Sequence, residues 1–287
     1  MADFETQAQR YAEAIERELE EGRLNFPTAF DVSMRIKRLA DDPNASLDQI
    51  AKAVQAEPVL SAKVVRMANS VALNPYGTPI TSVTDGVRRI GLATLRCLAF
   101  AVAAEQLARD HRSKGMRLIA SGLWVHSVEV ACWSYALARK LRVGSADTAL
   151  FAGMLVDIGE FFLVARAAEF PELEADMPRF AEFVATWSEP VSHALLEALD
   201  MPEEILNAFD YEDPYGGSWP PKRLGDVLFV AGLATETPNP LATLRHENRQ
   251  QLLDSATLGI EREAFGSLIE SVQTERQKML AAICGQQ

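Results

Sequence analysis

Residues 57–96 read EPVLSAKVVRMANSVALNPYGTPITSVTDGVRRIGLATLR and carry the pattern that decides the fold. Pro58 suits the first turn of a helix, where its missing N–H costs nothing. After it, apolar side chains recur at helical spacing, which predicts an amphipathic helix over residues 58–73. A shorter helix should start at Ser82 and end at Gly91, because glycine favours helix termination. This stretch therefore predicts a helical protein.

The same helical period continues along the rest of the chain. Ser46-x-x-Gln49 has the spacing of a capping box and should open a helix that ends before Pro58. Beyond Pro171 the helices should shorten, because further prolines interrupt the pattern. No segment alternates strictly between apolar and polar residues, so an all-α, multi-helical fold is expected. Further helices are predicted over residues 4–21, 92–109, 115–141, 146–168, 224–234 and 261–283, with breaks near Pro178, Pro190 and Pro202 and a loop at 237–240.

Residues 211–221 (YEDPYGGSWPP) form the clearest internal linker. We expect an N-terminal helix or linker remnant over residues 1–22, a helical domain over 23–212, and a helical extension over 213–287 that packs on the core. The first segment is equally well explained as a partly exposed leader. An aromatic cluster should pack the seam between the two halves: Phe161, Phe162, Phe170, Phe180, Phe183 and Trp187.

Composition limits the function classes. With 28 Lys and Arg against 40 Asp and Glu, the formal net charge is −12. Phosphate contacts dominate nucleic-acid affinity, so this charge disfavours nucleic acid and an anionic membrane surface as partners. The three cysteines are scattered and form no CxxC motif, as in a reducing compartment. The N-terminus lacks a signal peptide, and the apolar stretch 92–107 contains Arg96 and Glu105. These features predict a cytoplasmic protein without membrane association.

The stretch 57–96 resembles the HDOD family, helical relatives of the HD metal-dependent phosphohydrolases. The family carries an acidic-proline start, an apolar helix ending in Asn-Ser, a segment led by Ile and Ser, and an Ile/Leu-Gly step. The matching residues are Glu57-Pro58, Asn69-Ser70, Ile80-Thr81-Ser82 and Ile90-Gly91.

A second stretch, residues 123–163, adds the family's W-x-H-S and a-G-L-L-H-D-I-G motifs. The similar segments here are WVHS at 124–127 and FAGMLVDIG at 151–159. Leu195-Leu196 and Met201-Pro202 fall where a third, weaker family segment lies. The resemblance covers roughly residues 25–212, and it implies an HDOD-like helical domain.

The resemblance also allows the metal ligands to be compared one by one. HD-type phosphohydrolases use a His, an adjacent His-Asp pair and a later Asp or His. Here His126 matches the first ligand and Asp157 the acidic half of the pair, but Val156 and Gly232 replace the others. A catalytic divalent ion needs at least three protein ligands. We therefore expect no metal, no cofactor and no catalytic residue.

His126 and Asp157 need another explanation. Both lie on apolar helix faces, and a buried carboxylate needs a partner. One interpretation is a structural His–Asp pair that remains from a metal-binding ancestor. The other is a degenerate pocket that reuses these groups to bind a ligand.

Positive charge concentrates at Lys63, Arg66, Arg88 and Arg89, with Asn69 beside them. Such a patch could hold an acidic partner segment or a small anionic ligand. The alternative is a solvated face with local ion pairs, in which Asn69 caps a helix or braces a loop.

By resemblance, the expected function is a non-catalytic regulatory or protein-interaction module in bacterial signal transduction. It would be the output part of a two-component response regulator or a stand-alone HDOD protein, with other signalling proteins as partners. The alternative is a metal-dependent phosphohydrolase acting on a nucleotide or cyclic dinucleotide. A third hypothesis, nucleic-acid binding, is weakened by the net charge. The family assignment does not itself identify a partner.

Overall fold

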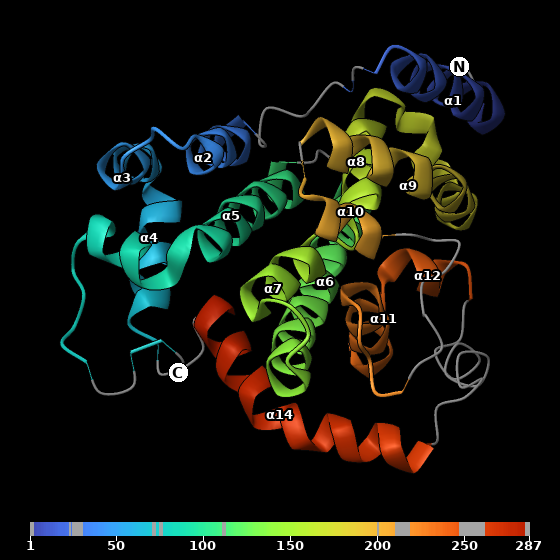
Figure 1. Ribbon diagram of the computed structural model, residues 1–287. Helices are drawn as coiled ribbons and strands as arrows, with labels where there is room; N and C mark the ends of the chain where they lie inside the picture. The colour runs from blue at the N-terminus through green and yellow to red at the C-terminus, as the bar shows by residue number, and fades with distance from the viewer. Residues whose placement is uncertain are drawn as a thin grey trace.

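A computed structural model describes residues 3–22, 24, 31–70, 73–74, 77–110, 113–199, 201–209, 219–246 and 262–284. Within these residues all regular secondary structure is helical, which confirms the predicted all-α fold (Figure 1). The elements are α1 (Phe4–Glu20), α2 (Asp31–Asp41), α3 (Leu47–Gln55), α4 (Pro58–Ala68), α5 (Val83–Asp110), α6 (Lys114–Leu141), α7 (Ala146–Met154), α8 (Ile158–Arg166), η2 (Ala167–Glu169), η3 (Pro171–Ala175), α9 (Met177–Ala198), α10 (Glu203–Ala208), α11 (Leu224–Ala234), α12 (Pro240–Leu244) and α14 (Arg262–Cys284).

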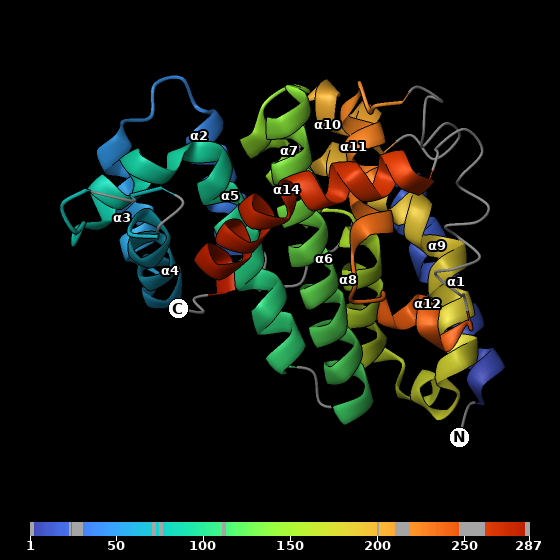
Figure 2. The same cartoon turned by 90° about the horizontal axis from the view of Figure 1, so that it is seen from below.

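The helices gather on two sides of α6. Helices α2 to α5 form one side, while α1 and α8 to α12 form the other (Figure 1). Helix α6 packs against α5, α7, α8, α11 and α14, so it is the central element of the core. Helix α14 crosses α6 and reaches α4 on one side of the molecule (Figure 2).

Local sequence signals set several helix ends. Ser46 and Gln49 form the predicted capping box at the start of α3. Gly91 has φ 78° and kinks α5 where a helix end was predicted, but the chain resumes its helix at once. Helix α4 ends at Ala68 rather than at residue 73, because the Asn69 side chain bonds across to Ile80 instead of extending the helix.

Two expectations about helix breaks were wrong. The single helix predicted over residues 146–168 is divided into α7 and α8 by a turn at residues 155–157. This turn places Asp157 at the N-cap position of α8. Conversely, α9 continues through Pro190, although an internal proline costs about 3 kcal/mol. The buried face of α9, which includes Val184, Val191 and Leu195, offsets that cost.

The N-terminal helix is part of the packed core. Tyr11 is fully buried, and its hydroxyl donates to the Leu163 carbonyl at 2.8 Å. Its ring stacks on Phe170 and Phe183, two members of the predicted aromatic cluster. Most of the predicted linker, residues 211–218, lies outside the described residues.

One described stretch, Ala146–Glu169, has the length and apolarity of a candidate membrane span. Its most apolar window is 78% buried inside the fold, and the turn at residues 155–157 interrupts it. It is therefore a core segment of this protein.

Candidate functional site

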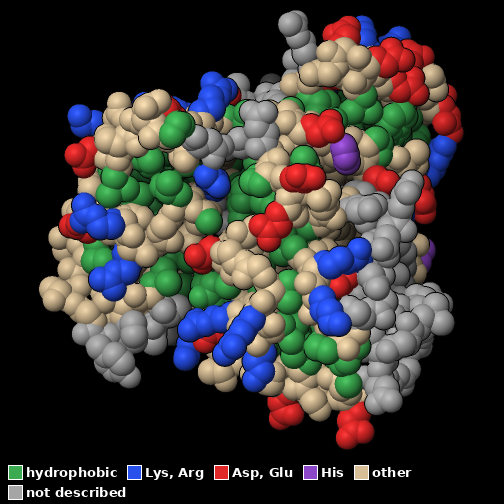
Figure 3. Space-filling view, in the orientation of Figure 1, with side chains coloured by type: hydrophobic (Ala, Val, Ile, Leu, Met, Phe, Trp, Pro, Cys, Tyr) green, Lys and Arg blue, Asp and Glu red, His purple; other side chains and the backbone are tan. Residues whose placement is uncertain are grey.

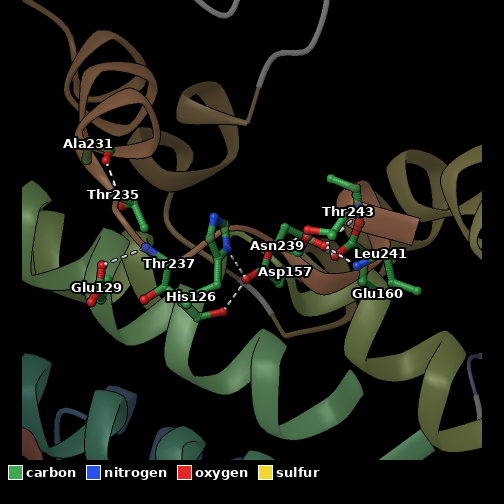
Figure 4. A network of polar contacts seen from close by, with 12 residues as sticks. His126, Glu129, Asp157, Glu160, Ala231, Thr235, Thr237, Asn239, Leu241 and Thr243 are labelled. Carbon is green, nitrogen blue, oxygen red and sulfur yellow. Dashed lines mark hydrogen bonds and ion pairs between the residues drawn. The ribbon is translucent and has the colours of Figure 1, made fainter. Parts of the chain in front are cut away.

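A polar network lies at the turn between α7 and α8, with Asp157 at its centre (Figure 4). Asp157 is only 5% exposed. Its Oδ2 accepts a hydrogen bond from the Ser127 hydroxyl at 2.5 Å and contacts Nδ1 of His126 at 2.7 Å. Its Oδ1 accepts from the Asn239 amide at 3.2 Å. Three donor groups from α6 and the start of α12 therefore satisfy this buried carboxylate.

Asn239 joins the network to α12. Its Oδ1 caps that helix by accepting from the backbone N–H groups of Leu241 and Ala242 at 2.8 and 3.2 Å. Its amide nitrogen donates to Asp157 and also to Glu160 at 2.6 Å. Sequence reasoning placed residues 237–240 in a loop and missed this residue. The Asn-Pro pair is a helix-start signal, but the contact with Asp157 spans 82 residues and has no local signature.

Two groups in the network, Glu160 and His126, have raised pKa values. Burial raises the pKa of Glu160 to about 7, and the nearby Asp157 carboxylate adds to that rise. Burial by itself lowers the pKa of His126, but the adjacent Asp157 carboxylate, together with Glu160 and Glu129, outweighs burial and raises this pKa above its usual value. Glu160 and His126 therefore both hold a proton more firmly in the folded protein than in the unfolded chain.

The residues present do not fit a catalytic metal ion. Val156 stands beside Asp157 and packs against the apolar core. A Cβ added at Gly232 would meet no atom within 4 Å, so a side chain there would enter open space. The Asp157 oxygens already accept from protein donors. In the described part of the chain, no three His, Cys, Asp or Glu side chains are grouped to hold a metal ion.

The structure divides the predicted basic patch. Arg66 donates to the Ile283 carbonyl at 3.2 Å, at the end of α14, and Lys63 is half-buried on α4. Asn69 braces the loop after α4 rather than facing a ligand. Arg88 and Arg89 line a pocket at the start of α5. Only these two of the five predicted patch residues line that pocket.

Comparison with known proteins agrees with the fold. The family model described as the HDOD domain matches residues 26–214. The chain therefore belongs to the HDOD family. No match was found among proteins of curated function.

Three crystal structures are similar along almost all of this chain. A protein of Shewanella amazonensis SB2B, provisionally named a metal-dependent phosphohydrolase, is 22% identical with a TM-score of 0.69, and the match covers 96% of this chain and 99% of that one. An HDOD domain protein of unknown function from Geobacter sulfurreducens is 23% identical with a TM-score of 0.56, covering 98% of each chain. A protein of Marinobacter aquaeolei VT8, provisionally named a signal transduction protein, is 19% identical with a TM-score of 0.56, covering 96% of this chain and 66% of that one. At these identities the likeness shows the fold alone.

Proposed function

We propose that this protein is a non-catalytic regulatory module of bacterial signal transduction that acts in the cytoplasm by binding other signalling proteins. It would serve as the output part of a two-component response regulator or as a stand-alone HDOD protein. Membership of the HDOD family and the similarity to the Marinobacter protein support a signalling role.

The observation that carries the non-catalytic part is the state of Asp157. In a metal site its oxygens would face the ion, beside a histidine. Here the neighbouring position is Val156, and the carboxylate accepts from Ser127, His126 and Asn239 instead. A carboxylate with three donors can connect α6, α8 and α12 by hydrogen bonds and so stabilise their packing.

The second candidate is a metal-dependent phosphohydrolase acting on a nucleotide or cyclic dinucleotide. It is favoured by the provisional name of the Shewanella protein and by the proximity of one imidazole and two carboxylates in the network. His126, Asp157 and Glu160 would have to rearrange to share an ion.

Metal content and hydrolysis distinguish the two candidates. We expect the purified protein, dialysed after exposure to manganese, iron or zinc, to retain no stoichiometric metal by elemental analysis. We also expect no hydrolysis of cyclic dinucleotides or nucleoside phosphates with manganese present. One retained equivalent of metal, together with hydrolysis that His126→Ala abolishes, would make the protein an enzyme. His193→Ala is the matched control, because His193 is exposed on α9 and remote in sequence from the network.

The partner is tested by capture from lysate of the source bacterium, followed by mass spectrometry and a binding measurement with the purified candidate. We expect a component of a signalling system that binds saturably. A protein that captures no such component in repeated experiments would not be an interaction module of this kind.

A further inference from the structure

A pocket opens between the loop after α4 and the first turns of α5, away from the Asp157 network. Its volume is about 430 Å³, within the usual range for small-molecule sites. In Figure 1 the start of α5 lies on the side of the molecule opposite α9 and α12. The lining residues are Thr78, Pro79, Ile80, Thr81, Asp85, Arg88 and Arg89.

Side chains hold the walls of this pocket in place. The Asn69 amide donates to the carbonyls of Ile80 and Val65 at 2.6 and 2.9 Å, and its oxygen accepts from the Ile80 N–H at 2.7 Å. Asn74 donates to the Thr78 carbonyl at 3.1 Å. The backbone of Thr78 and Ile80 is therefore held by hydrogen bonds that need no ligand, which lowers the entropic cost of binding.

In their contacts with the described residues, Arg88 and Arg89 each use only one guanidinium nitrogen. Arg88 uses Nη1 to contact Asp85 at 2.6 Å, and its side chain is 64% exposed. Arg89 uses Nη1 to donate to the Leu73 carbonyl and to Asn74 Oδ1, at 3.2 and 3.3 Å. A guanidinium group has five N–H donors, so the remaining nitrogens of both can bind an anion in a bidentate manner.

The pocket lining and the whole protein have net charges of opposite sign. Arg88 and Arg89 outnumber Asp85, so the lining carries one net positive charge in a chain of net charge −12. The Asp85 carboxylate holds Arg88 from one side only, and both groups are more than half exposed. Pro79 and Ile80 add an apolar wall that could contact the organic part of a ligand.

We propose that this pocket binds a small organic phosphate of about the size of a mononucleotide, with Arg88 and Arg89 contacting the phosphate group. Pro79 and Ile80 cover its less polar part. This site shares no residue with the Asp157 network, so the binding proposal can be tested independently of the proposed function.

The experiment is isothermal titration of the whole protein with AMP, GMP, CMP and UMP, with inorganic phosphate and adenosine as partial ligands. We expect at least one nucleotide to bind with a Kd below about 1 mM, and adenosine to bind at least tenfold more weakly. Arg88→Gln should weaken the nucleotide at least tenfold. Lys140→Gln removes the same charge from an exposed position at the end of α6 and should leave the Kd within twofold.

Asp85→Asn provides a test in the opposite direction. Asparagine keeps one acceptor oxygen, which can serve either the Ser82 hydroxyl or Arg88, and it removes the competing charge beside Arg88. Nucleotide affinity should rise about fivefold, roughly the effect of one exposed charge. The proposal is overturned if none of the four nucleotides binds below about 1 mM, or if Arg88→Gln and Lys140→Gln weaken binding equally.

Discussion

Asp157 is the residue at the centre of the polar network. The family pattern places an acidic side chain here, and the fold still directs it towards His126. Ser127 and Asn239 complete its hydrogen bonds, so the buried charge has partners without a metal ion. The network thus has three donor side chains, Ser127, His126 and Asn239, and two acceptor carboxylates, Asp157 and Glu160.

Replacing that acceptor should be costly. Asp157→Ala leaves the donors of Ser127, His126 and Asn239 without their shared partner, and we expect a loss of about 3–5 kcal/mol in the free energy of unfolding. Urea denaturation measures this loss, and Asp48→Ala at an exposed position serves as the control. A variant with unchanged stability but lost partner binding would instead make Asp157 a functional residue.

Glu160 should make stability depend on pH. Its pKa is about 7 in the folded protein against an ordinary value of 4.5, so the folded state holds the proton more tightly. Stability from this group is therefore present at low pH and is lost as pH rises from about 4.5 through 7. The raised pKa of His126 gives a change of the same sign, lost as pH rises through its folded-state value.

Glu160→Gln isolates this contribution, because glutamine keeps an acceptor for Asn239 without titrating. We expect the variant to gain on the order of 1–3 kcal/mol relative to wild type between pH 5 and pH 8. Urea unfolding at several pH values measures the difference. A difference that stays constant across this range would show that Glu160 does not titrate there.

At the scale of elements, glycines decide how closely α7 and α8 approach their neighbours. A Cβ at Gly153 would lie 2.5 Å from the Ala131 Cα of α6, and one at Gly159 would lie 2.4 Å from the Ser188 carbonyl of α9. Both contacts involve backbone atoms, which cannot rotate away. The packing of α7 on α6 and of α8 on α9 thus requires residues without side chains at these two positions.

Two glycine substitutions should have opposite effects. Gly153→Ala forces α7 away from α6 and should destabilise by about 1–3 kcal/mol. Gly232→Ala lies within α11, where the new methyl group meets nothing, and should stabilise by roughly 0.5–1 kcal/mol through helix propensity. Thermal unfolding of both variants tests this, and equal shifts of the same sign would contradict the packing described.

In the whole molecule, α14 packs on the central helix α6 and also contacts α4. Arg276 pairs with Glu129 of α6 at 3.1 Å and lies over the Trp133 ring at 5.2 Å. Glu129 in turn accepts from the Thr237 N–H, in the segment that carries Asn239. The C-terminal helix is therefore linked to the Asp157 network, although it lies beyond the residues that match the family model.

Figure 3 shows Lys and Arg side chains scattered over the face seen in Figure 1, with acidic side chains gathered most densely at the upper right, where α1 lies. The Arg276–Glu129 pair is of a different kind, because the two side chains are only 9% and 12% exposed. Such a pair depends on α14 being folded against α6.

Arg276→Ala should therefore destabilise by about 3–5 kcal/mol, because it leaves Glu129 buried without its cation. Lys278→Ala, on an exposed position of the same helix, should change stability by less than about 0.5 kcal/mol. Trp133 fluorescence and urea unfolding report the change. Equal stability of the two variants would mean that α14 is not packed on α6 in solution.

Local patterns in the sequence indicate the fold class, the family and several helix ends. Apolar periodicity is a local property, and so is the capping box at Ser46. The family motifs also indicated that His126 and Asp157 lie close together, which their 2.7 Å contact confirms.

Tertiary packing sets which residues share a site. Packing divides the apolar segment by a turn at residues 155–157, and it allows α9 to continue through Pro190. It also places Asn239 in contact with Asp157, 82 positions earlier in the chain. It also separated Arg66 from Arg88 and Arg89, because Arg66 turns towards α14. The reason is physical: burial energy gained over a whole helix face can exceed local propensities, and contacts between distant segments leave no periodic trace in the sequence.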